Sequence, residues 1–219
     1  DEFRLLGMTD GVIAIQAEEA AKVRARLPSS RVIVAQHAAA ISAKAQPGSD
    51  DALLFVGSSA PANVAALERF LRESWPAIRA ARPNAQLKVA GSVGRAMGAA
   101  PEGVAMLGVV GDLAPLYAEA GVVISPLYTG SGLKIKLIEA LAAGKAVVGT
   151  SVTAQGVEDV VRGAMVIADE PAAFARGCIE LLGDRGKRGA LAEKALACAC
   201  DHFSADACFR EFVMAIKGA

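Results

Sequence analysis

Short runs of apolar residues, each closed by glycine or a small polar residue, alternate along the chain with amphipathic stretches. Continuous apolar runs of this length are typical of strands that are buried on both faces of a parallel sheet. The intervening stretches repeat their apolar residues every three or four positions, which predicts helices. The expected strands occupy residues 53–57, 87–91, the beginning of 104–120, 122–125, 146–149 and 164–168.

This alternation predicts an α/β fold: a Rossmann-like parallel sheet flanked by helices, with strand order near 3-2-1-4-5-6. A further strand, helix and strand are expected in residues 10–37, ahead of the main sheet. Amphipathic helices are expected from residue 61 onward, in 171–184 and 187–203, and at the end of the chain. There are no internal repeats that would indicate a solenoid.

Residues 122–150 carry the clearest pattern, a strand at 122–125, a glycine-rich turn at 129–132, a helix over about 133–143 and a strand at 146–149. A strand, helix and strand in this order form a right-handed unit with parallel strands. The turn then lies at the carboxyl end of a strand and the amino end of a helix. Ligands bind at this edge of such sheets.

The chemistry of the turn favours an anion. Gly130 and Gly132 can adopt positive φ and let a ligand approach the backbone. Ser131 is the expected N-cap, and the first amides of the helix have no partner within it. Lys134 and Lys136 follow in the first turns, where an isolated helix would prefer acidic residues. This inverted preference indicates a bound anion, with a diphosphate as the first candidate.

Glu139 stands out because its helical neighbours are apolar. A carboxylate on a buried helix needs a hydrogen-bond donor, and a sugar hydroxyl can supply one. Two simpler interpretations stay open. Lys136 and Glu139 are three residues apart and could form a surface pair worth about 0.2–0.5 kcal/mol. Glycine-rich turns between a strand and a helix are also common in α/β folds that bind no phosphate.

The segment PLYTGSGLKIKLIEALAAGKAVVGT resembles the signature of the group 1 glycosyltransferases, a retaining family with the GT-B fold and nucleotide-sugar donors. The matching residues are Pro126, Gly130, Gly132, Glu139, Ala140, Gly144, Val147, Val148 and Thr150. The resemblance implies that the amides of the turn hold the donor diphosphate and that Glu139 binds the nucleotide ribose. Many members carry a second glutamate eight positions earlier, where this chain has Ser131.

The resemblance also suggests the site. Candidate catalytic residues are Lys134, Lys136 and Glu139. Candidate substrate-binding residues are Thr129, Gly130, Ser131 and Gly132 in the turn, with Gly57, Ser58 and Asn63 after the first strand of the main sheet. Family members often place basic residues after that strand. Because this chain has serines and an asparagine there, we expect the two lysines to supply more of the positive charge.

By the same resemblance, the chain is organised around one donor-binding domain. Residues 1–40 correspond to the end of the N-terminal acceptor domain, of which the fold would retain a remnant, and residues 41–50 to the linker. Residues 51–202 correspond to the nucleotide-sugar-binding domain, and residues 203–219 to a helix that crosses back to brace the first domain. A full first domain needs about 100–150 residues. We therefore expect a donor-binding fragment that is inactive alone.

Composition narrows the class further. The chain has 219 residues, 53% of them hydrophobic, and 23 basic residues balance 23 acidic ones. This balance provides no overall field to attract nucleic acid. No apolar run approaches the ~20 residues that span a bilayer, and no signal peptide opens the chain, so a cytoplasmic location is expected. Peripheral membrane contact stays open. Cys178, Cys198, Cys200 and Cys208 show no metal-ligand spacing and are expected to be reduced structural thiols.

The resemblance implies transfer of a hexose, with retention, from a nucleoside diphosphate sugar to a carbohydrate or lipid-linked acceptor in polysaccharide biosynthesis. No cofactor or metal is expected, because the helix dipole and the lysines can stabilise the diphosphate. A dinucleotide-dependent oxidoreductase is disfavoured, since GSSAPA follows the first strand of the main sheet in place of G-x-G-x-x-G. A non-catalytic nucleotide-binding or partner-docking module is the remaining alternative.

Overall fold

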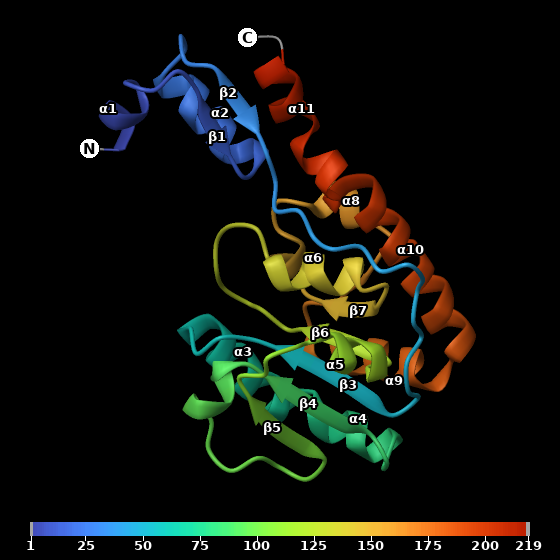
Figure 1. Ribbon diagram of the computed structural model, residues 1–219. Coiled ribbons are helices and arrows are strands. Elements are labelled where there is room, and N and C mark those ends of the chain that lie inside the picture. The colour runs from blue at the N-terminus through green and yellow to red at the C-terminus, as the bar shows by residue number, and fades with distance from the viewer. Residues whose placement is uncertain (1, 218–219) are drawn as a thin grey trace.

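The computed structural model describes residues 2–217, and its larger sheet has six parallel strands (Figure 1). These strands are β3 (Ala52–Val56), β4 (Gln86–Ala90), β5 (Val104–Gly108), β6 (Val122–Ser125), β7 (Ala146–Gly149) and β8 (Val166–Ile167). Their spatial order is β5-β4-β3-β6-β7-β8. Numbered from the first strand of this sheet, the order is 3-2-1-4-5-6, and the predicted Rossmann-like α/β fold is confirmed.

Three central strands, β3, β6 and β7, form where the chain is almost continuously apolar. All four residues of β7 are buried, as are the first four residues of β3 and the first three of β6. Side chains alternate between the two faces of a strand, so burial of consecutive residues requires cover on both faces.

Helices supply this cover in two layers. One core cluster joins the sheet to α3 (Pro61–Glu73), α4 (Trp75–Ala81), η1 (Ser92–Ala96) and α9 (Pro171–Gly183). The other joins the sheet to α5 (Ala114–Glu119), α6 (Ile135–Ala142), α7 (Ser151–Ala154), α8 (Glu158–Val161) and α10 (Arg185–Phe203). The sheet is therefore the middle layer of three, and α6 lies directly beside β7 and α10.

A smaller unit precedes this domain and projects at one end of the molecule (Figure 1). It consists of α1 (Glu2–Leu6), β1 (Val12–Ala14), α2 (Ala17–Arg26) and β2 (Val32–Val34), with the two strands paired in parallel. The last helix, α11 (Ala205–Lys217), packs beside β2. The Cys208 thiol of α11 donates a hydrogen bond to the His37 carbonyl at 3.6 Å.

A connecting segment (residues 35–51) leads from the small unit to β3 without regular secondary structure. Two fully buried cations hold it: Lys145 donates to the carbonyl of Gln46, and Arg188 donates to the carbonyl of Pro47 at 2.7 Å and pairs with Asp50. Burial lowers the pKa of Lys145 to about 8. These bonds fix the path of the segment across the domain. The predicted boundaries at residues 40, 50 and 202 stay predictions.

Three details differ from the sequence expectation. Helix α6 begins at Ile135 rather than near residue 133, and β8 has only two residues where five were predicted. Helix α4, which was not predicted, begins at Trp75 directly after Ser74 ends α3. Proline is favoured in the first turn of a helix and disrupts helix interiors, so Pro76 explains why one long helix is divided at this point.

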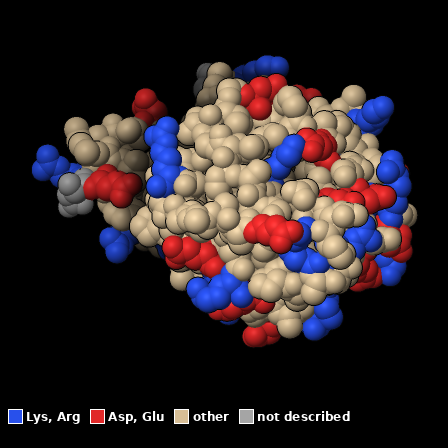
Figure 2. All heavy atoms as spheres, turned by 90° about the horizontal axis from the view of Figure 1, so that it is seen from below, with Lys and Arg blue, Asp and Glu red and all other residues tan. Residues whose placement is uncertain are grey.

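The surface carries both signs of charge. On the face shown in Figure 2, Lys and Arg side chains are interspersed with Asp and Glu side chains, in agreement with the equal totals in the sequence. Among the helices formed by residues 2–217, none combines the length and the apolar character that a bilayer crossing requires.

The four cysteines are free thiols in the structure. Cys178 and Cys208 are buried, Cys198 is half-buried and Cys200 is exposed. Burial raises the pKa of Cys178, and it raises the pKa of Cys198 to about 11. A raised pKa leaves little reactive thiolate near neutral pH. Within residues 2–217, no three His, Cys, Asp or Glu side chains group in a way that could hold a metal ion.

Candidate functional site

The turn between β6 and α6 has the backbone conformation that its glycines suggest. Gly130 has φ of 126° and Gly132 has φ of 77°, a region that side-chain-bearing residues rarely adopt. The expected capping role of Ser131 is wrong, because α6 begins at Ile135 and Lys134 occupies the N-cap position. No side chain caps this helix end. Its first amides therefore have no side-chain acceptor among the described residues, and the Leu137 amide donates to the Lys134 carbonyl at 2.9 Å.

The hydroxyl groups of two threonines hold the strand end that leads into this turn. Thr150 donates to the carbonyl of Leu127, and Thr153 donates to the carbonyl of Ser125 at 2.5 Å. Thr150 and Thr153 are fully buried. The peptide groups just before the turn are thus satisfied by side chains of the next βα connection, which positions the turn on the sheet edge.

The two lysines of the turn have different environments. The Lys134 ammonium donates to the carbonyl of Gly132 at 2.7 Å, and burial lowers its pKa. Lys136 contacts both carboxylate oxygens of Glu139, at 3.0 and 2.7 Å. The surface pair that the sequence left open is therefore formed. Its side chains are 47% and 29% exposed, so it contributes about 0–1 kcal/mol and can be displaced easily.

Several candidate residues meet in a cavity of about 260 Å³ between the carboxyl ends of β3 and β6, which we call the β3–β6 cavity. Its lining residues are Phe55, Val56, Gly57, Ser58, Asn63, Ser125, Leu127, Leu133, Lys134, Ile135 and Lys136. The structure thus brings together the predicted residues 57, 58, 63, 134 and 136. Thr129, Gly130, Ser131 and Gly132 do not line this cavity, and their substrate-binding role stays a prediction.

The β3 side of this cavity is rigidly built. The Asn63 amide donates to the carbonyl and to the hydroxyl oxygen of Ser58, both at 3.1 Å. A Cβ atom on Gly57 would lie 2.7 Å from the ring of Phe55, so no side chain fits at this position. Gly57 is buried and lines the cavity with its backbone alone.

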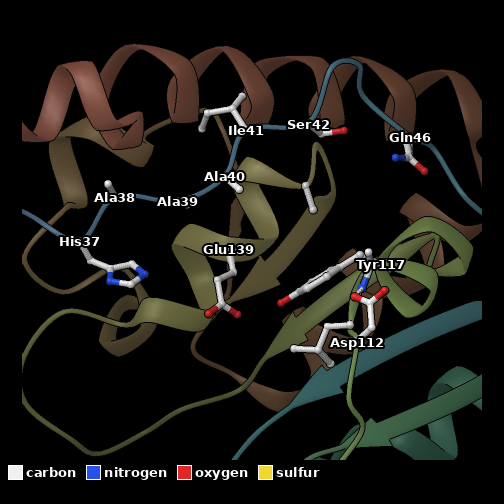
Figure 3. Close-up of a pocket in the computed structure, with 13 residues that line it drawn as sticks. His37, Ala38, Ala39, Ala40, Ile41, Ser42, Gln46, Asp112, Tyr117 and Glu139 are labelled. Carbon is white, nitrogen blue, oxygen red and sulfur yellow. Dashed lines mark hydrogen bonds between the residues drawn. The ribbon is translucent and has the colours of Figure 1, made fainter.

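A larger cavity, of about 580 Å³, lies along the other side of α6 under the connecting segment (Figure 3). We call it the linker cavity. It is lined by His37, Ala38, Ala39, Ala40, Ile41, Ser42, Gln46, Asp112, Leu113, Ala114, Tyr117, Glu139 and Ala143. A void of about 10 Å³ shares Tyr117 with this cavity and Ser125 and Lys136 with the β3–β6 cavity. The two cavities therefore adjoin each other across the first turns of α6.

Glu139 and Tyr117 form the polar part of the linker cavity. Figure 3 shows the Glu139 carboxylate directed into the cavity and the Tyr117 hydroxyl directed toward that carboxylate. Tyr117 is 7% exposed, and its hydroxyl has no hydrogen-bond partner among the described residues. Burial raises the pKa of Tyr117, and the negative charge of Glu139 raises it further. The phenol is therefore a neutral donor at physiological pH.

A family comparison decides the class. The model for "Glycosyl transferases group 1" matches residues 50–184, more than half of the chain. The chain belongs to the group 1 glycosyltransferases. The matched range contains every candidate site residue named from the sequence. A comparison with curated protein sequences gave no match.

Solved structures confirm the GT-B fold for this chain. S. aureus TarM, in a complex with UDP, superposes with a TM-score of 0.75 at 11% identity over 97% of this chain. The pneumococcal O-GlcNAc transferase GtfA, with UDP and GlcNAc, gives 0.73 at 13% identity over 99%. Anabaena HepE, with UDP and glucose, gives 0.72 at 15% identity over 99%. The chain spans 45%, 46% and 66% of these proteins, respectively.

The sequence of this chain did not reveal the linker cavity. In the sequence, no motif marks Tyr117, Asp112 or His37 as a site residue. No spacing rule links them, because the connecting segment reaches α5 and α6 only through its tertiary path. The pattern of a tyrosine on the buried face of α5 is also typical of plain core packing.

Proposed function

We propose that this chain binds a nucleoside diphosphate sugar and serves as the donor-binding part of a retaining glycosyltransferase. The proposed acceptor is a carbohydrate or a lipid-linked sugar. The observation that carries the proposal is the β3–β6 cavity, where Gly57, Ser58 and Asn63 face Lys134 and Lys136. Family membership and the UDP in the TarM, GtfA and HepE complexes support it.

In this proposal the donor diphosphate occupies the β3–β6 cavity. The uncapped amino end of α6 offers amide donors and the positive end of its dipole. Lys136 would exchange Glu139 for a phosphate oxygen, and the exposed weak pair makes this exchange inexpensive. Lys134 would support the turn through its bond to Gly132 and add a second positive charge.

The nucleoside would occupy the linker cavity, with the ribose against Glu139. That cavity has an apolar wall from residues 38–41 and polar groups at Asp112, Tyr117 and Glu139. The flat nucleobase could lie against the apolar wall and the polar ribose against the polar groups, which matches such a lining. Ribose hydroxyls that donate to the Glu139 carboxylate would replace the hydrogen bonds that Lys136 now gives it.

During transfer, the bond between the anomeric carbon and the diphosphate oxygen breaks, and negative charge develops on the departing diphosphate. Preorganised donors and cations aimed at that charge stabilise the transition state, each by about 2.7–4 kcal/mol where removal has been studied. Lys136 and the amino end of α6 take this role in the proposal. We further propose that this chain binds the donor by itself. Transfer of the sugar would also need groups that bind the acceptor.

Calorimetric titration of the chain with UDP, GDP, ADP and pyrophosphate tests the proposal. We expect one nucleoside diphosphate to bind more tightly than the other two and than pyrophosphate. Absence of binding to all four would refute it. Self-association without nucleotide affinity would instead support the partner-docking alternative, for which the exposed Val213, Met214 and Ile216 of α11 offer an apolar surface.

A further inference from the structure

The Tyr117 hydroxyl is buried without a hydrogen-bond partner among the described residues. Buried polar groups in folded proteins are normally paired, so such an exception calls for a physical reason. The hydroxyl is directed toward the Glu139 carboxylate, which lines the same cavity (Figure 3). Burial and this carboxylate both raise the pKa of Tyr117, so the phenol keeps its proton.

In the unliganded fold, the two Glu139 oxygens accept from the Lys136 ammonium, at 3.0 and 2.7 Å. Lys136 also lines the β3–β6 cavity, while Glu139 lines the linker cavity. An anion in the first cavity would therefore attract Lys136 away from Glu139. The carboxylate would then lose a partner at the moment when the neighbouring phenol can replace it.

We propose that Tyr117 is a positioning residue that forms a hydrogen bond to Glu139 when Lys136 leaves Glu139 and pairs with a diphosphate. The Tyr117 hydroxyl then donates to one carboxylate oxygen and leaves the other directed at the ribose. This inference rests on the proposed donor site. It couples the two cavities: occupation of the diphosphate position prepares the carboxylate for the nucleoside.

The coupling gives Tyr117 a distinct signature. Removal of its hydroxyl should weaken the binding of a complete nucleoside diphosphate. The binding of pyrophosphate should not change, because pyrophosphate does not use the linker cavity. The hydroxyl also has no hydrogen bond to residues 2–217 that the substitution would remove. Tyr117→Phe is therefore expected to fold with a thermal midpoint no lower than that of the wild type.

The test is calorimetric titration of the full chain with UDP, GDP, ADP and pyrophosphate, in the wild type, Tyr117→Phe, Glu139→Gln and the double variant. We expect Tyr117→Phe to raise the Kd of the bound nucleoside diphosphate by about 5–20-fold and the Kd of pyrophosphate by less than about twofold. In the Glu139→Gln background the same change should have little further effect. Tyr128→Phe is the matched control, since Tyr128 stacks on Arg69 at 3.8 Å and lines neither cavity.

Three results would overturn the inference: unchanged nucleotide affinity in Tyr117→Phe, an equal loss for pyrophosphate, or additive losses in the double variant. A lowered thermal midpoint for Tyr117→Phe would assign the hydroxyl a structural role instead. If the wild type bound no nucleotide at all, the donor-site proposal itself would fail, and this inference with it. Nucleotide binding that does not depend on Tyr117 would refute this inference alone.

Discussion

Replacement of Lys136 by methionine separates the two halves of the proposed ligand. Methionine keeps most of the apolar stem, which limits the effect on packing, and removes the ammonium that lines the β3–β6 cavity. It also frees Glu139, which Lys136 contacts at 3.0 and 2.7 Å. Diphosphate binding should therefore weaken, while nucleoside binding should stay the same or become tighter.

The size of the effect follows from the exposure of the pair. A charge-assisted hydrogen bond contributes roughly 1.5–3 kcal/mol when water is excluded. Lys136 is 47% exposed, and it must first leave Glu139 at a cost of about 0–1 kcal/mol. We expect a net loss of about 1–2 kcal/mol, or about 5–30-fold in the Kd of pyrophosphate.

Calorimetry with pyrophosphate, the best-binding nucleoside diphosphate and the matching nucleoside measures this difference. Lys187→Met is the control, because Lys187 forms a comparable exposed pair with Glu180 at 2.5 Å and lines neither cavity. Equal losses for nucleoside and pyrophosphate would refute the reasoning. So would an effect of the control as large as that of Lys136→Met.

Other predictions concern the fold. The folded-state pKa of Lys145, about 8, lies below the ordinary 10.5, so the unfolded chain binds the extra proton between these values. From pH 7 to pH 10, urea unfolding should therefore show the wild type gaining about 1–3 kcal/mol of unfolding free energy relative to Lys145→Met. The same free-energy difference between the two proteins at both pH values would contradict the buried charge. Phe174 is fully buried and packs edge-on against Phe70, with 5.7 Å between the ring centroids. Phe174→Ala should therefore lower the unfolding free energy by about 3–5 kcal/mol, and a loss below about 1 kcal/mol would argue against this packing. A thiol reagent should modify exposed Cys200 in the folded chain and reach buried Cys178 only on unfolding, as peptide mapping by mass spectrometry can verify.

The sequence by itself determined the layered architecture. Strands such as β3, β6 and β7 were visible because burial on both faces of a parallel sheet demands unbroken apolar runs. The right-handed crossover then limits the strand order to few choices. The glycine turn before α6 was also visible, since positive φ at Gly130 and Gly132 is a local backbone property.

Tertiary structure decided what local patterns could not encode. Whether Glu139 would face a ligand or Lys136 depended on rotamers at one helix end, and the start of α6 depended on the backbone of Lys134. The linker cavity forms where hydrogen bonds from Ala39 to Phe203, from Ser42 to Ala142 and from buried Lys145 to Gln46 hold the connecting segment beside α6. Its unpartnered Tyr117 faces Glu139 only after these separate elements pack together. Sequence periodicity records which face of an element is buried, whereas the choice of partner across that face arises from long-range packing.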